Sequence, residues 1–255
     1  MLIDIHVHTN RYSACGRATP EEMVARACAI GLGGLVITEH HIRWGAAELA
    51  ALQAQFPAIK LFSGIEVSSP ELDDYLIYGV SDPDVWAPPI DPARLIPRVR
   101  AAGGVVILAH PYRYRPEAPA ELDRYPVDGV EVMSNNILNH AHIPARALAA
   151  RLGAFATAAS DAHRVETLGL YALRFRRRIA DERDLVAALR ARAFDLYADR
   201  ERLALENTGI AAQQQEIERL IALGYDDRQI TNQVAGVNTM IVHSLRLGLD
   251  VSRPM

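Results

Sequence analysis

The chain has 255 residues, half of them hydrophobic, which predicts one barrel-sized domain or one such domain with a small appendage. Its formal net charge of -4 excludes a strong basic field that would draw the whole chain to nucleic acid. Two cysteines are too few for a disulfide framework, and no apolar run approaches about 20 residues, so we expect a cytoplasmic protein without a membrane span.

The first predicted strand lies almost at the N-terminus, at residues 2–9, and contains Asp4 and two histidines, unlike a signal peptide. Residues two apart in a strand point the same way, so His6 and His8 project from one face near its C-terminal end. Two imidazoles on one rigid edge are a ready pair of metal ligands.

Helices and further strands alternate up to about residue 192. The first helix has Thr19 as its N-cap, Pro20 next and Glu22 three residues after the cap. Helices are expected at 20–30, 46–55, 92–102, 143–152 and 181–192. Strands are expected at 33–38, 59–67, 75–80, 105–109, 127–133, 154–158 and 169–175. This alternation implies an α/β protein with parallel βαβ units, and at least six such units suggest a closed barrel.

Polar residues collect at or just past the C-terminal ends of these strands. They are His6, His8, His40, Glu66, His110, Asp161 and His163. In a barrel these ends form one rim, where active sites lie. Neutral imidazoles and carboxylates suit zinc, manganese and iron, and the lack of a thiolate set favours an open, catalytic metal cluster.

Five segments carry a family resemblance. They are residues 4–9, 37–41, 64–67, 109–111 and 160–163. In this order they resemble the motifs of the PHP (polymerase and histidinol phosphatase) family, and the resemblance covers residues 1–200. It implies a distorted seven-stranded β/α barrel that holds two or three divalent metal ions and hydrolyses phosphate esters.

The resemblance also implies three metal positions. The first takes His6, His8, Glu66 and Asp161, the second shares Glu66 and adds His110, and the third takes His40 and His163. The chain departs from the family twice. Ser13, Ala14 and Cys15 stand where the family often has an acid or a histidine, and the segment 73–78 lacks a histidine that is often present. The first departure weakens the third position or leaves a water or Cys15 as its ligand, and the second leaves the second position with fewer protein ligands.

The expected mechanism is attack on phosphorus by a metal-bridged hydroxide. Asp161 and either His163 or His40 are the catalytic candidates, because a histidine not committed to metal could protonate the leaving oxygen. Substrate-binding candidates in the rim loops are Arg11, Arg43, Arg113, Arg115 and Asn135. The alternative for each arginine is a solvated surface side chain, and for Asn135 a simple turn.

From about residue 204 the pattern changes to short helices at 213–223, 227–234 and 238–247. Helix, glycine-containing turn and helix is the helix-turn-helix arrangement, and it loosely resembles a LuxR-type DNA-binding segment. Residues 206–255 carry four arginines against six acids, which argues against DNA binding. We therefore predict a metal-binding barrel at 1–203 and a helical appendage at 204–255 that packs on the barrel or on a partner subunit in a homo-oligomer.

The sequence thus predicts a metal-dependent phosphoesterase that acts on a phosphate mono- or diester of a small metabolite, a nucleotide or an oligonucleotide end. One alternative is an amidohydrolase-type hydrolase. Such sites usually use a carboxylated lysine, and the only lysine, Lys60, begins its strand far from the rim. The other is a ligand-sensing regulator with a DNA-binding tail.

Overall fold

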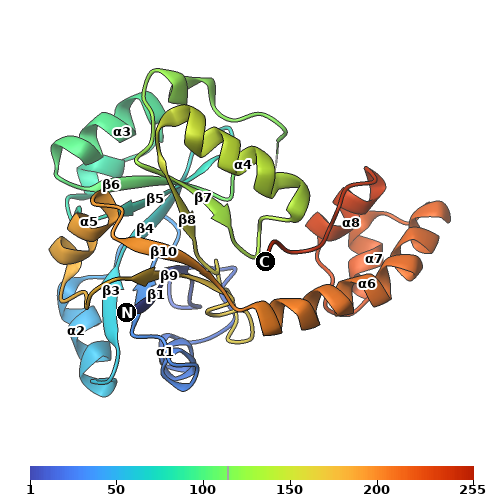
Figure 1. Ribbon diagram of the computed structural model, residues 1–255, viewed down its shortest axis with the longest axis horizontal. Coiled ribbons are helices and arrows are strands. Elements are labelled where there is room, and N and C mark those ends of the chain that lie inside the picture. The colour runs from blue at the N-terminus through green and yellow to red at the C-terminus, as the bar shows by residue number, and fades with distance from the viewer. Residues whose placement is uncertain (114) are drawn as a thin grey trace.

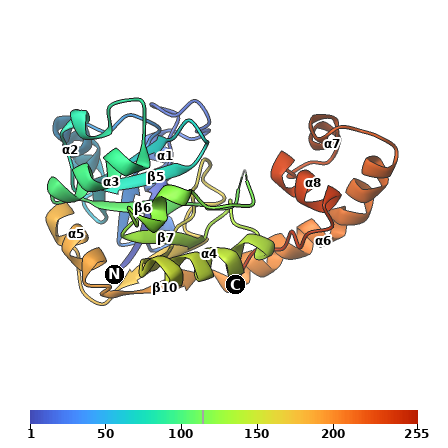
Figure 2. The same ribbon diagram turned by 90° about the horizontal axis from the view of Figure 1, so that it is seen from above.

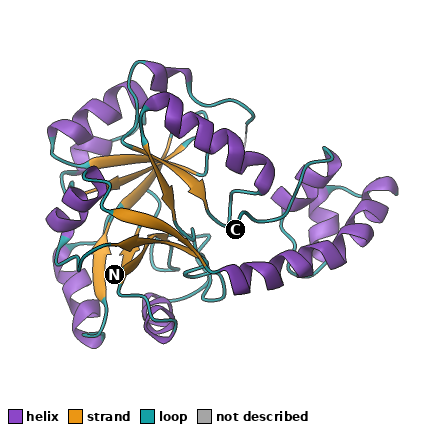
Figure 3. Ribbon diagram, in the orientation of Figure 1, coloured by secondary structure: helices purple, strands orange, loops and turns teal. Residues whose placement is uncertain are grey.

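The computed structural model describes residues 1–113 and 115–255, and its strands form two five-stranded sheets with helices on the outside (Figure 3). The first sheet has the order β10-β9-β1-β2-β3, with strands Phe194–Ala198, Tyr171–Phe175, Leu2–Val7, Gly34–Ile37 and Lys60–Ser63. The second has the order β4-β5-β6-β7-β8, with strands Ile65–Ser68, Asp74–Tyr78, Val105–Ala109, Gly129–Met133 and Phe155–Ala158.

Both sheets mix parallel and antiparallel neighbours. Strand β5 runs antiparallel to β4 and β6, and β9 runs antiparallel to β1 and β10. The α/β class is therefore confirmed. The closed seven-stranded barrel is not confirmed, because among the described residues only two isolated bridges join one sheet to the other.

The strand expected at 59–67 is divided at Gly64 into β3 and β4, which belong to different sheets. A Cβ atom at Gly64 would lie 3.0 Å from Thr38 Cγ2 and 3.1 Å from the ring of Tyr78. Only glycine lets the chain cross so close to these side chains, and this crossing starts the second sheet.

Two backbone connections hold the polar ends of the sheets together. Glu66 N–H donates to the carbonyl oxygen of Glu39 (3.1 Å), and His41 N–H donates to that of Glu66 (2.7 Å), which ties β4 to the end of β2. His8 N–H donates to Ala162 O (2.9 Å), which ties β1 to the segment after β8. The C-terminal ends of β1, β2 and β8 and the first residues of β4 therefore meet at one place.

The helices follow the predicted pattern closely up to residue 192. They are α1 (Pro20–Ala29), α2 (Ala46–Gln55), α3 (Pro92–Ala101), α4 (Asn139–Leu152) and α5 (Glu182–Arg190), with 3-10 turns at Pro83–Trp86 and Ala120–Asp123. The predicted cap of α1 is confirmed, because Thr19 and Glu22 form a reciprocal capping box. Strand β10 was not expected from the sequence.

A large apolar core lies between the sheets. The Tyr78 hydroxyl of β5 donates to the carbonyl oxygen of Ile5 in β1 (2.8 Å), and both residues are fully buried. This hydrogen bond crosses from one sheet to the other, so the core fixes how the two sets of strand ends face each other.

The chain after β10 leaves the sheets as one long helix, α6 (Arg200–Ala222), and folds back through α7 (Asp227–Gln233) and α8 (Thr239–Arg246) (Figures 1 and 2). The predicted boundary between residues 203 and 204 falls inside α6. The three helices share a small apolar core that includes Leu138, Ile217, Leu220, Ile230, Ile241 and Val242. In the described part of the chain, no helix combines the length and apolarity needed to cross a bilayer.

Candidate metal centre

Glu66, on β4, is the centre of the polar cluster. Its Oε1 atom lies 3.3 Å from His6 Nε2 and 3.1 Å from His110 Nε2, and its Oε2 atom lies 3.1 Å from both His8 Nε2 and His40 Nδ1. Burial alone would raise the pKa of this carboxyl, but the surrounding imidazoles hold its pKa well below the usual range. Four imidazoles from three different strand ends thus face one ionised carboxylate.

Asp161 follows β8 and approaches the same group from the other side. Its Oδ1 atom lies 3.2 Å from His6 Nε2 and 3.3 Å from His8 Nε2, and its Oδ2 atom lies 3.7 Å from His110 Nε2. The backbone φ of Asp161 is +49°, a left-handed conformation that is uncommon for a residue with a side chain. Asn136 donates its amide to the same carboxylate. Backbone strain and side-chain support together aim Asp161 at the cluster.

A third group contains His8, His40 and His163. The rings of His40 and His163 each stack on His8 with 4.5 Å between centroids. Burial lowers the pKa of His40 to about 4 and also lowers the pKa of His163. Both imidazoles are therefore neutral near pH 7, which is the form that binds metal. Ser13 belongs to the loop that differs from the PHP family pattern, and it is buried next to this group. Its hydroxyl accepts a hydrogen bond from the backbone N–H of His40 (3.1 Å).

Asp74 is a candidate ligand that the sequence reasoning missed. It joins Glu66 and His110 in a buried group, with its Oδ2 atom 3.8 Å from His110 Nε2. Burial and the charge of Glu66 raise the pKa of Asp74. Because β5 is antiparallel to both neighbours, its first residue, not its last, lies at the polar edge, beside Ser68 and Ala109. Asp74 thus stands in the segment where the expected histidine is missing.

The cluster meets the chemical requirements of a divalent metal site. Glu66 Oε2 and Asp161 Oδ1 are buried, yet neither receives a well-directed hydrogen bond from the described residues. Burial lowers the pKa of His8, but the charges of Asp161 and Glu66 outweigh this and raise it to about 9. The carboxylates thus draw protons onto the imidazoles, and a divalent cation would take the place of those protons.

Three further buried carboxylates form hydrogen bonds with the segments that carry the cluster. Glu131, on β7, lies 3.2 Å from His6 Nδ1 and accepts a hydrogen bond from His110 N–H (3.0 Å). Asp4 accepts from the backbone N–H groups that follow β8, and Glu39 accepts from Thr9. None of the three is among the site residues expected from the sequence, although an acid inside an apolar strand is a visible signal. Of the three, Glu131 contacts a ring nitrogen of a candidate ligand, so it is placed to fix the tautomer and orientation of His6.

The predicted substrate-binding residues divide into two sets. Arg113 lies 3.9 Å from Asp161 Oδ2, and buried Asn135 lies next to the cluster, so both face the candidate site. Arg11, Arg43 and Arg115 instead form ion pairs with Glu48, Glu182 and Asp73, respectively. The structure therefore brings the seven proposed ligands, Arg113 and Asn135 together, and it places the other three arginines in ion pairs elsewhere.

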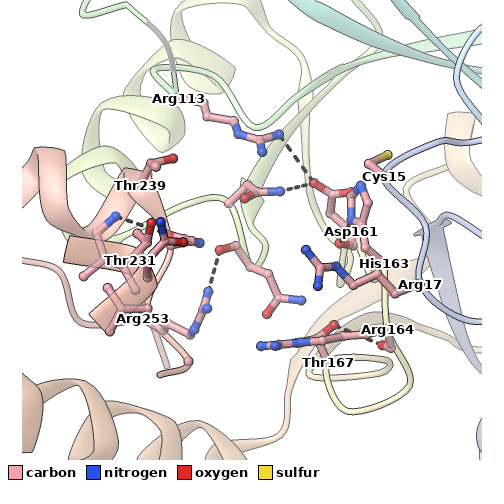
Figure 4. Close-up of a pocket in the computed structure, with 17 residues that line it drawn as sticks. Cys15, Arg17, Arg113, Asp161, His163, Arg164, Thr167, Thr231, Thr239 and Arg253 are labelled. Atoms are coloured by element: carbon pink, nitrogen blue, oxygen red, sulfur yellow. Dashed lines mark hydrogen bonds and ion pairs between the residues drawn. The ribbon is translucent and has the colours of Figure 1, made fainter. Parts of the chain in front are cut away.

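A cavity of about 700 Å³ opens from this cluster toward the C-terminal helices (Figure 4). Asp161, His163 and Cys15 line it on the metal-cluster side. The end of α7, the turn after it and the first residues of α8 line it on the other side. The helical segment is thus a wall of the space in which a substrate of the metal cluster would lie.

Comparisons with known proteins identify a similar fold and one family-model match. Residues 139–194 match the model of the PHP-associated region. A two-domain protein from Bacteroides vulgatus, containing a predicted PHP-like metal-dependent phosphoesterase, superposes with a TM-score of 0.62 at 16% identity, over 78% of this chain and 64% of the other. PsfC from Pseudomonas syringae superposes with a TM-score of 0.58 at 17% identity, over 79% of this chain and 92% of the other. None of the curated proteins matches the sequence.

Proposed function

We propose that this chain is a PHP-type, divalent-metal-dependent phosphoesterase that hydrolyses a phosphate mono- or diester; the match of residues 139–194 to the PHP-associated model and the fold shared with a PHP-like protein support this. The observation that carries the proposal is the convergence of four imidazoles on Glu66, with Asp161 on the opposite side. Imidazole nitrogens and carboxylate oxygens in an open, non-thiolate cluster are typical ligands of catalytic zinc, manganese or iron.

Three ligand groups are proposed. The first contains His6, His8, Glu66 and Asp161, the second contains Glu66, Asp74 and His110, and the third contains His8, His40 and His163. When bound, divalent ions activate water for attack on phosphorus and stabilise the charge that develops on the phosphoryl oxygens. Whether two or three ions bind, and which metal they are, is decided by metal analysis.

The residues around the cavity have separate tasks in this reaction. Hydrolysis forms a bond from a water oxygen to phosphorus, breaks the ester P–O bond and leaves one water proton on the departing oxygen. Arg113, beside Asp161, is placed to bind phosphoryl oxygens through its guanidinium. The lowered pKa values of His40 and His163 favour neutral imidazoles, which suits metal ligation or proton acceptance more than proton donation.

The two alternative functions receive less support from the structure. Lys60, the only lysine, begins β3 and pairs in register with Gly34, at the strand end opposite the cluster, so a carboxylated lysine is not available there. The first turn of α8 would have to face DNA in a helix-turn-helix reader, yet Asn238 and Thr239 line the cavity. We therefore favour ester hydrolysis over both alternatives.

The test combines metal analysis with two chromogenic esters, p-nitrophenyl phosphate and bis(p-nitrophenyl) phosphate, which separate monoesterase from diesterase activity. We expect Asp161→Asn and His8→Ala to lose bound metal and hydrolysis together. The matched controls, Asp195→Asn and His243→Ala, change exposed side chains and should retain both. Wild-type protein that hydrolyses neither ester with any added metal, or an Asp161→Asn variant with normal rate and metal content, would refute the proposal.

A further inference from the structure

The cavity between the metal cluster and the C-terminal helices is lined mainly by positive charge. Among the described residues that line it, four are arginines (Arg17, Arg113, Arg164 and Arg253) and one, Asp161 of the candidate metal cluster, is an acid. Arg253 is buried and already engaged, because it donates to Asn135 O (2.5 Å) and lies 2.8 Å from Glu206. Arg113 faces Asp161. Two positive charges remain beyond the cluster, at Arg17 and Arg164.

Arg17 and Arg164 both adjoin His163 through the backbone. Arg17 N–H donates to the carbonyl oxygen of His163 (2.7 Å), and Arg164 is the next residue in the chain, held by Thr167, whose hydroxyl donates to Arg164 O (3.2 Å). Both side chains extend into the hollow toward the C-terminal helices (Figure 4). Within the described residues, neither guanidinium forms an ion pair or a hydrogen bond. Both arginines are exposed, and two guanidinium groups without a countercharge beside one cavity suit an anion.

Asn135 supplies a second, independent feature of the cavity. Its side-chain amide donates to Ser160 O (2.5 Å), so the amide orientation is fixed and Oδ1 is the acceptor. Asn135 is only 7% exposed, and its Oδ1 atom has no hydrogen-bond partner among the described residues. A buried acceptor without a donor is costly, so a ligand hydroxyl would satisfy it.

The C-terminal helices complete the cavity with neutral polar groups. Asn232 of α7 and Thr239 of α8 lie in the lining, and their side chains form no hydrogen bond with other described residues. Asn238 uses its Oδ1 atom to cap α8. This wall offers donors and acceptors without charge, which suits hydroxyl groups.

We propose that the substrate is a phosphate ester of a polyhydroxylated, sugar-like molecule with a second anionic group, and that residues 204–255 close the pocket around it. The scissile phosphate lies at the metal cluster, a hydroxyl donates to Asn135, and the second anion lies between Arg17 and Arg164. This assignment rests on the proposed phosphoesterase function. The cavity volume is within the range of small-molecule sites.

The test compares two probes that differ by one anionic group, fructose 1,6-bisphosphate and fructose 6-phosphate. The measured quantity is the ratio of their kcat/KM values, in which a general loss of activity cancels. Wild-type protein should prefer the bisphosphate by about tenfold or more, the size expected for charge-assisted hydrogen bonds. Arg17→Ala and Arg164→Ala should each reduce this ratio several-fold, mainly through KM. Arg183→Ala, an exposed arginine on α5, is the matched control and should retain it.

A binding measurement separates this inference from the function itself. Calorimetry with the same two sugar phosphates reports the affinity ratio even if no ester is hydrolysed. The expected result is tighter binding of the bisphosphate, lost in the Arg17 and Arg164 variants and weakened by Asn232→Trp, which fills the helical wall. Equal dissociation constants for the two probes, or arginine variants with the wild-type preference, would overturn the assignment. An unchanged affinity in Asn232→Trp would overturn the role of the C-terminal wall.

Discussion

Asp74 gives the sharpest test of the metal centre. Replacing its carboxylate by a neutral amide should stabilise the metal-free protein and destabilise the metal-bound protein. In the metal-free protein, burial and the charge of Glu66 raise the pKa of Asp74. A raised folded-state pKa means that the ionised carboxylate costs stability, and that this cost appears as the pH rises through the folded-state pKa. Asp74→Asn removes the cost, so the metal-free variant should melt at a higher temperature than wild type at pH 7.

In the metal-bound protein, Asp74→Asn should instead be destabilising, because it removes a metal ligand. Asp74 is one of the three side chains that could hold an ion next to Glu66 and His110. Loss of a supporting partner around a metal typically weakens binding about 10- to 100-fold, so loss of a direct ligand should cost at least about 100-fold, or about 2.7 kcal/mol. The variant should therefore bind one ion fewer per chain than wild type under limiting metal. Its melting temperature should also rise less than that of wild type when metal is added.

The assay is calorimetric titration of the chelator-treated protein, together with thermal unfolding with and without added metal. The matched control is Asp73→Asn, one residue earlier, where the carboxylate pairs with Arg115 and not with the cluster. It should keep the wild-type number of ions. An Asp74→Asn variant with wild-type stoichiometry and affinity would refute the second ligand group.

Three further predictions concern the support of the cluster and the core. The His8 pKa of about 9 lies above the unfolded-state value of 6.5, so it contributes stability that is complete below pH 6.5 and is lost as the pH rises through 9. Thermal unfolding of chelator-treated protein should show the melting temperature falling from about pH 7 to about pH 10, and a flat profile would contradict this. In Glu131→Gln, the single amide oxygen cannot accept hydrogen bonds from both His6 Nδ1–H and the backbone N–H of His110. Metal affinity measured by titration should therefore fall about 10- to 100-fold. Unchanged affinity would show that Glu131 does not orient the ligands. Tyr78→Phe leaves a buried carbonyl of β1 without its donor and should cost about 1 to 3 kcal/mol in denaturant unfolding, while no change would mean that the bond between the sheets is not stabilising.

Much of the candidate site is visible in the sequence, because a parallel strand delivers its last residues to a common edge whatever the rest of the fold does. His6, His8, His110 and Asp161 each follow an apolar run, and the structure brings them within a few ångströms of Glu66 or of one another. The cap of α1 was equally visible, since Thr19 and Glu22 interact locally. The local sequence pattern and the direction of the strands are sufficient to predict where these residues lie.

Only the tertiary structure decided the rest. Asp74 reaches the cluster because β5 runs antiparallel to its neighbours, and strand direction depends on long-range pairing that no local pattern specifies. The division of the sheets at Gly64 depends on how closely Thr38 and Tyr78 pack there. Arg17 and Arg164 share a cavity with α7 and α8 because the chain, after leaving the sheets through α6, folds back through these two helices. The residue types thus indicated metal chemistry, whereas the folded chain determined which side chains complete the cluster and line the cavity beside it.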